Sequence, residues 1–166
     1  MPQTLEQLAT ELEVTIDQLP EELSSRVLRW TQQLCESLEK NYYDYHKRMI
    51  TNNSQRYTEG ELSNYAQSQL DAMNNGTANL MRFRIQTGRK YHKIIQQDYD
   101  TFQNRNEYRD GSVHAFVDKN TGEVYKPAGW RAPAKYVRYD MRIIKDRDYL
   151  HNSPNVDWAG GYLYLR

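Results

Sequence analysis

A chain of 166 residues is long enough for one domain, or for a compact domain with a helical arm, and its single cysteine, Cys35, excludes an internal disulfide. Hydrophobic residues make up 38% of the chain, but 14 residues are tyrosines and the mean hydropathy is -0.98. We therefore expect a small core, a polar surface and no membrane span. No signal-peptide pattern opens the sequence, which predicts a protein that stays inside the cell or is carried inside a particle.

Charge is divided unevenly along a chain whose formal net charge is zero. Residues 1–75 contain 6 Lys and Arg against 12 Asp and Glu, a net charge of −6, whereas residues 76–166 contain 16 against 10, a net charge of +6. A basic half suits the binding of an anion such as nucleic acid. The opposite charges equally suit contact between the two halves, or neighbouring subunits set head to tail, and charge alone favours none of these.

The beginning of the sequence is typical of helices. Thr4 and Gln7 have the spacing of a capping box, and they open a predicted helix over residues 4–13 with apolar positions on one face. A second start signal at Thr15 predicts a short helix that ends at Leu19.

A long helix is predicted from about Glu21 to Ile50. Its apolar residues recur at steps of three or four and form one stripe, made of Leu23, Val27, Trp30, Leu34, Leu38, Tyr42, Tyr45 and Met49. Cys35 lies on the apolar side, where a buried small hydrophobe is expected rather than a nucleophile. Residues 51–61 are polar and predict a loop. A further helix is expected over residues 62–73, and it is stopped by the Asn-Asn-Gly at 74–76.

After residue 76 the apolar residues alternate, as they do in strands. The segments that predict strands are residues 80–85, 90–95, 112–118, 123–127 and 162–165. Gly88 supplies the turn between the first two, whereas residues 96–111 are polar and show no period. The short connections favour antiparallel pairing. The prediction is an α+β fold, with an acidic helical region over residues 1–75 and a basic antiparallel sheet domain of about five strands over residues 76–166.

A basic aromatic loop follows the fourth predicted strand. Pro127 removes a ladder donor and Gly129 lets the chain reverse, so we expect Trp130 to project, partly buried, from a rigid loop. Cations neutralise phosphates and flat rings stack on bases. The predicted partner-binding residues are Lys126, Trp130, Arg131, Lys135, Tyr136 and Arg138. In the alternative interpretation, Trp130 plugs the sheet and the cations are ordinary solvated surface.

The sequence offers little support for catalysis. His114 and Asp118 fall on the same face of one predicted strand, near His92 on the next, but no nucleophile motif accompanies them, so ordinary hydrogen-bonded side chains are favoured. Zinc-type Cys/His spacing, the phosphate-loop motif and the dinucleotide-binding fingerprint do not occur. We therefore expect a protein that is not an enzyme and has no catalytic residues, metal or cofactor.

The second half of the sequence also resembles a known family. The resemblance is carried by His114–Asp118, Thr121–Gly122, Val124–Ala128, Trp130 and Ala132–Lys135. These segments are similar to a family of small tailed-phage proteins, especially those of marine and cyanobacterial hosts, and Gly88–Ile94 and Asp157–Tyr164 fit the same family. The resemblance covers residues from about 80 to 166. It implies a viral origin and assigns no activity.

Two functional hypotheses follow from these observations. The first is a non-enzymatic phage protein that binds a macromolecule, either nucleic acid or a host or viral protein, through the basic aromatic loop. The alternative is a virion structural or virion-associated protein, because a long helix, many tyrosines and oppositely charged halves suit repeated subunit contacts. Both hypotheses are compatible with a homo-oligomer, and both place the protein in the host cytoplasm or the virion, without a membrane partner.

Overall fold

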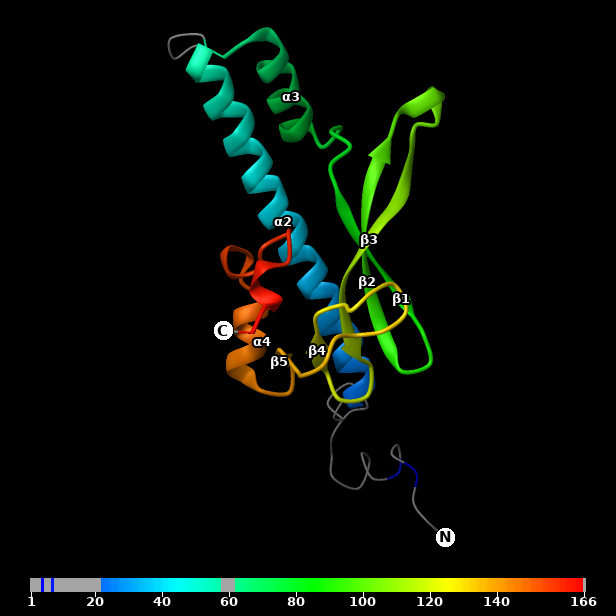
Figure 1. The fold of residues 1–166 in the computed structure, drawn as a ribbon. Helices are drawn as coiled ribbons and strands as arrows, with labels where there is room; N and C mark the ends of the chain where they lie inside the picture. The colour runs from blue at the N-terminus through cyan, green and yellow to red at the C-terminus, as the bar shows by residue number, and fades with distance from the viewer. Residues whose placement is uncertain (1–3, 5–6, 8–21, 58–61, 166) are drawn as a thin grey trace.

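A computed structural model describes residues 4, 7, 22–57 and 62–165. It confirms the α+β fold, with a long helix beside a five-stranded antiparallel sheet (Figure 1). Thr4 and Gln7 form the predicted capping box, because the Thr4 N–H donates to Gln7 Oε1 at 2.8 Å and the Gln7 N–H donates to Thr4 Oγ1 at 3.2 Å. The rest of the predicted helix over residues 4–13 lies outside the described residues, as does the short helix that begins at Thr15.

The long helix α2 (Leu23–Tyr57) continues seven residues beyond the predicted end at Ile50. The prediction of a loop from residue 51 was therefore wrong as far as Tyr57. An established helix extends easily through polar residues, because each added residue gains a hydrogen bond without a new nucleation cost. Of the helices in the described part of the chain, none combines the length and the apolar character needed to cross a bilayer.

The next helix, α3 (Asn64–Asn75), lies beside the second half of α2 (Figure 1). The Ser63 hydroxyl caps its first turn by accepting from the Ala66 N–H at 3.1 Å. Gly76 ends it in the left-handed region at φ 72°, as the Asn-Asn-Gly sequence predicts.

Neighbouring strands of the sheet follow one another in chain order, and every pair is antiparallel. The strands are β1 (Arg82–Thr87), β2 (Tyr91–Asp100), β3 (Glu107–Asp118), β4 (Glu123–Tyr125) and β5 (Tyr139–Asp140). β2 and β3 extend into the polar stretch 96–111, for which no strand was predicted. Cross-strand pairs hold this extension, including the Tyr99 ring against Tyr108 with centroids 5.2 Å apart.

The predicted final strand over residues 162–165 is wrong. Residues Gly161–Leu163 form a 3-10 turn instead, entered through Gly160 at φ 90°. Tyr162 and Leu163 are both buried although they are adjacent, which an alternating strand with one covered face would not allow. The fifth strand is the two-residue β5.

One face of the sheet packs on α2. Residues directly opposite one another in successive strands share a face, and one such row runs through Thr87, His92, Val117, Val124 and Tyr139. Val117 and Val124 belong to the core, and Tyr139 packs against it. The α2 stripe contributes Val27, Trp30, Leu34 and Leu38 to this core, whereas its members Leu23, Tyr45 and Met49 are exposed. The buried core residues are Val27, Trp30, Leu34, Cys35, Leu38, Met81, Phe83, Ile94, Ala115, Val117, Val124, Met141, Leu150, Val156, Tyr162 and Leu163. The acidic and basic parts of the sequence therefore share this core.

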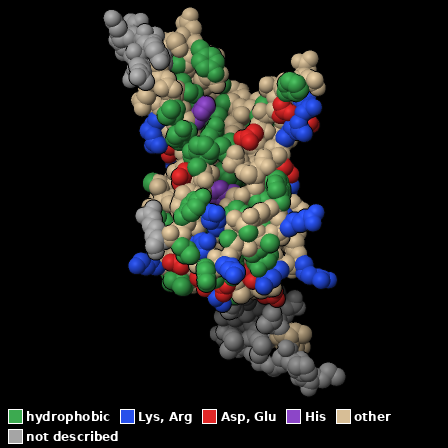
Figure 2. All heavy atoms as spheres, in the orientation of Figure 1, with side chains coloured by type: hydrophobic (Ala, Val, Ile, Leu, Met, Phe, Trp, Pro, Cys, Tyr) green, Lys and Arg blue, Asp and Glu red, His purple; other side chains and the backbone are tan. Residues whose placement is uncertain are grey.

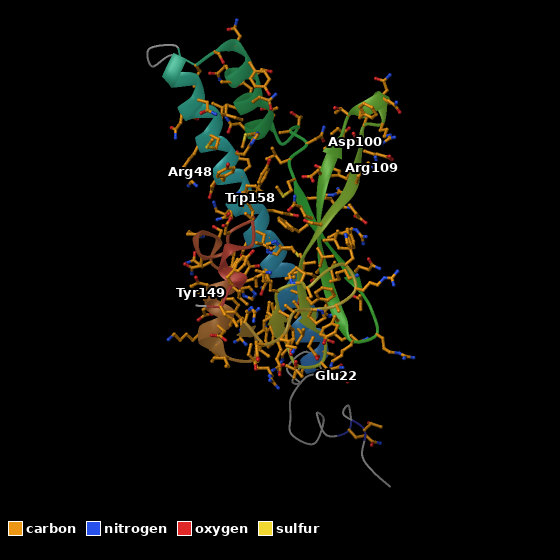
Figure 3. All side chains as sticks on the ribbon, in the orientation of Figure 1. Glu22, Arg48, Asp100, Arg109, Tyr149 and Trp158 are labelled. Carbon is orange, nitrogen blue, oxygen red and sulfur yellow. The ribbon has the colours of Figure 1, made fainter. Side chains whose placement is uncertain are left out.

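The segment after α4 (Ile144–Leu150) returns to α2 and is hydrogen-bonded to it. Asn41 on α2 donates from Nδ2 to the Ser153 carbonyl at 2.9 Å and accepts from the Trp158 N–H at 3.1 Å. His151 Nε2 bonds to the Trp30 carbonyl at 2.9 Å. These contacts fix the last described segment against the long helix (Figure 3).

Gly122, in the turn between β3 and β4, should not tolerate alanine. Its φ is +80°, and an added Cβ would lie 3.2 Å from Met141 Cβ and 3.3 Å from Val27 Cγ2. We expect Gly122→Ala to lower the free energy of unfolding by about 1–3 kcal/mol, measured by urea denaturation. Gly129→Ala is the control, because nothing lies within 4 Å of that Cβ and its φ is outside the left-handed region. Equal losses in the two variants would contradict the expectation.

Candidate nucleic-acid interface

The sheet face opposite α2 carries a second row of side chains. Gln86, Lys93, Phe116 and Tyr125 lie directly opposite one another on β1 to β4. Phe116 is only 1% exposed, although it lies outside the core beneath α2. The Tyr91 ring packs edge-on against Phe116 with centroids 5.7 Å apart, and the loop at residues 126–135 crosses this face (Figure 1). A small apolar floor therefore lies beneath the loop that the sequence singled out.

Main-chain contacts close this loop at its base. The Ala134 N–H donates to the Lys126 carbonyl at 2.7 Å, and Pro127 pairs with Pro133 in an antiparallel bridge. Nearer the tip, the Ala128 N–H donates to the carbonyl of residue 132 at 3.0 Å. The tip is thereby fixed, which reduces the entropy lost when a ligand binds. The loop that the sequence singled out is thus closed by main-chain contacts.

Cationic side chains gather where the loop meets the sheet. A pocket of about 200 Å³, called the basic pocket below, is lined by Gln86, Gly88, Arg89, Lys90, Tyr91, Lys93, Phe116 and Arg131. Trp130 lies beside it and is 47% exposed, which agrees with the expectation of a partly buried ring. Lys93 Nζ lies 5.8 Å from the Trp130 ring centroid and 5.5 Å from that of Phe116. Figure 2 shows Lys and Arg side chains with apolar groups between them in the lower half of the view.

The cations of the basic pocket differ from others on the surface. Arg84 binds Asp110 at 2.6 Å and Arg109 binds Asp100 at 3.2 Å, the latter pair near the outer end of the β2–β3 hairpin (Figure 3). The Arg84 guanidinium lowers the pKa of Asp110 to about 2. No ion pair is found for the four cations of the basic pocket within the described part of the chain, and no carboxylate lines it. Uncompensated positive charge in a pocket attracts anions.

Lys126 lies apart from the basic pocket. Its Nζ is 4.7 Å from the Tyr164 ring centroid, and it lines a different cavity of about 200 Å³ together with His114 and Trp158. The structure thus brings Trp130 and Arg131 together, and places Lys126 on another side of the loop.

The other three predicted partner-binding residues lie at the end of the loop or just after it. Lys135 and Tyr136 are exposed, and Tyr136 adopts a φ of 75°. Arg138 instead braces the main chain: its Nε donates to the Leu163 carbonyl at 2.6 Å, and its Nη1 donates to the carbonyls of Lys135 and Tyr136, both at 2.9 Å. Arg138 therefore fastens the loop to the turn at Leu163.

His114 and Asp118 are both buried, and they have separate partners. His114 Nε2 hydrogen-bonds with the Tyr162 hydroxyl at 2.7 Å, and burial lowers the pKa of His114 to about 4. Asp118 Oδ1 accepts from the main-chain N–H groups of Asn120 and Thr121. The structure does not join the two into an acid–base pair. Among the described residues, no group of three or more His, Cys, Asp and Glu is placed to hold a metal ion.

Three cations of the basic pocket were missing from the sequence-based site. Arg89 and Lys90 belong to the β1–β2 turn and Lys93 to β2. The sequence placed these residues on a predicted turn and strand, but nothing in it linked them to a loop about forty positions later. The usable signal was the alternation of Lys93 with the core-facing His92 and Ile94, which puts Lys93 on the opposite face.

A model of a protein family, described as "Family of unknown function (DUF7717)", matches residues 14–165, which include every residue of the basic pocket. No curated protein and no solved structure matches the chain. The function must therefore be inferred from the residues of the site.

Proposed function

We propose that this chain, which belongs to the family of unknown function DUF7717, binds single-stranded nucleic acid through the basic pocket and Trp130. The observation that carries the proposal is the convergence of Arg89, Lys90, Lys93 and Arg131 on one pocket without a carboxylate in its lining. Phosphate is the anion that such a site suits, because several cations can share its oxygens.

The exposed indole beside the pocket favours a single strand over a duplex. Single-strand binders combine a positively charged groove with aromatic rings on which unpaired bases stack. Trp130 offers a partly exposed ring next to Lys93, on a loop that is already closed. Many proteins read duplex DNA by placing a helix in the major groove. No helix of the described residues lines the basic pocket, so this surface does not provide that geometry.

Fluorescence anisotropy with single- and double-stranded oligonucleotides tests the proposal. We expect tighter binding of the single strand, and an affinity that falls with salt at a logarithmic slope of about −0.7 for each phosphate held. Trp130→Ala should weaken binding by about 5- to 150-fold, since stacking contributes about 1–3 kcal/mol per base. Its melting temperature should change little, because the ring is 47% exposed.

Phe102→Ala is the matched control, because this ring is 65% exposed and lies in the 3-10 turn between β2 and β3. It should leave the affinity unchanged. An affinity that does not depend on the salt concentration, or the absence of binding at micromolar protein, would contradict nucleic-acid recognition and favour a protein partner.

A separate aromatic surface supports the second candidate, assembly with protein subunits of a phage particle. Exposed Tyr149, Tyr164 and Leu165 line a cavity of about 260 Å³ together with Arg138, Tyr139 and Tyr162. Aromatic residues are enriched at protein interfaces. Mass spectrometry of purified particles distinguishes the candidates: many copies per particle would support assembly, and absence from the particle would reject it.

A further inference from the structure

We infer that the basic pocket takes the terminal phosphate monoester of a nucleic-acid strand, with the adjoining base on Trp130. This inference rests on the proposed function and specifies which part of the strand enters the pocket. A phosphodiester within a strand carries one negative charge and two continuing chains. A terminal monoester carries a charge of about −1.5 to −2 near neutral pH, three acceptor oxygens and only one continuing chain.

The charge of the pocket fits the monoester better than the diester. Four cations line a pocket of about 200 Å³, and they come from two separate segments: Arg89, Lys90 and Lys93 from the β1–β2 hairpin, and Arg131 from the loop. Several cations around one pocket suit an anion with three acceptor oxygens better than one with a single charge. The pocket has the sheet as its floor, the turn on one side and the loop on another, an arrangement that suits the end of a strand.

Both flanking segments are held in place before a ligand arrives. In the β1–β2 turn, the Gly88 N–H donates to the Tyr91 carbonyl at 2.8 Å, and Lys119 Nζ donates to the Gly88 carbonyl at 3.0 Å. The Lys119 N–H also donates to the Lys90 carbonyl at 3.0 Å. The loop is closed by the Ala134–Lys126 hydrogen bond described above. A main chain that is already held in place loses little freedom when a ligand binds between the two segments.

Three forms of one deoxythymidine strand of about 12 nucleotides, each carrying an internal fluorophore, test the inference. The forms end in a 5′-phosphate, in a 3′-phosphate, or in hydroxyl groups at both ends. At about pH 7.5 we expect one phosphorylated form to bind about tenfold more tightly than the hydroxyl form. At about pH 5 this advantage should shrink, because the second pKa of the monoester is about 6. Inorganic phosphate should compete with the phosphorylated form for the pocket.

Lys93→Gln and Arg131→Gln should each reduce the advantage of the phosphorylated form. Arg109→Gln is the control, because Arg109 binds Asp100 and is not part of the basic pocket. Equal affinity for all three strands would overturn the inference and leave single-strand binding intact. Failure of every strand to bind would overturn the proposed function itself. Binding of thymidine monophosphate as tightly as the phosphorylated strand would overturn the inference in favour of a free-nucleotide site.

Discussion

Replacing Leu34 by alanine is expected to lower the free energy of unfolding by about 2–5 kcal/mol. Leu34 lies in the α2 stripe and is fully buried in the core shared with the sheet. Truncation removes apolar contacts and leaves a cavity that a long helix, held along its length, cannot close. Because small domains are stable by only about 5–15 kcal/mol, this is a large fraction of the total.

Urea denaturation followed by circular dichroism measures this loss. Gln32→Ala is the matched control: Gln32 lies on the same helix two positions earlier, and its side chain is exposed. The control should unfold at nearly the wild-type urea concentration. A Leu34→Ala protein as stable as the control would show that α2 does not depend on its packing against the sheet.

Acidification is expected to destabilise the protein through His114. Burial lowers the pKa of His114 from 6.5 to about 4 in the folded state, despite the opposing influence of Asp157. Between these two values the unfolded chain binds a proton that the folded chain does not, so the free energy of unfolding falls as the pH falls. The contribution of His114 to the free energy of unfolding is fully present above about pH 6.5, and about 3 kcal/mol of it is lost by about pH 4.

Denaturation curves across this pH window, compared with those of His114→Gln, isolate the effect. The amide of glutamine can still bond to the Tyr162 hydroxyl but does not titrate, so the variant should lose stability less steeply. His92 and His151 also have lowered pKa values, so they too reduce the free energy of unfolding as the pH falls, in the wild-type protein and in the variant alike. Asp110, with a pKa of about 2, loses its stabilising charge only at lower pH. Parallel slopes in the two proteins would contradict the role given to His114.

The sequence predicted those parts of the fold in which apolar residues repeat on one face. The α2 stripe and the β3–β4 hairpin belong to this class, whereas the end of α3 at Gly76 was predicted from the glycine itself. The extension of β2 and β3 was missed because polar contacts stabilise it, such as Arg82 Nε donating to Gln97 Oε1 at 2.8 Å. The turn at Gly161–Leu163 was misassigned because alternating residue types there do not correspond to alternating burial.

The sequence likewise identified some residues of the candidate site and missed others. Trp130 and Arg131 were identifiable, because prolines and a glycine mark a rigid loop in the sequence itself. The remaining cations depend on which sheet face the loop covers, and that follows from α2 occupying the other face. Arg138 was predicted from its charge alone, and nothing in the sequence indicated that it also donates to three main-chain carbonyls.

The contacts between α2 and the segment after α4 have a consequence for biosynthesis. The bonds from Asn41 to Ser153 and Trp158, and from Trp30 to His151, join residues 112, 117 and 121 positions apart. A ribosome that adds about 5–20 residues per second needs roughly 6–24 s to reach the later partners. During that interval the nascent helix has emerged while part of its apolar stripe is still uncovered. Newly made chains are therefore most exposed to chaperones, and to one another, before the His151–Trp158 segment is translated.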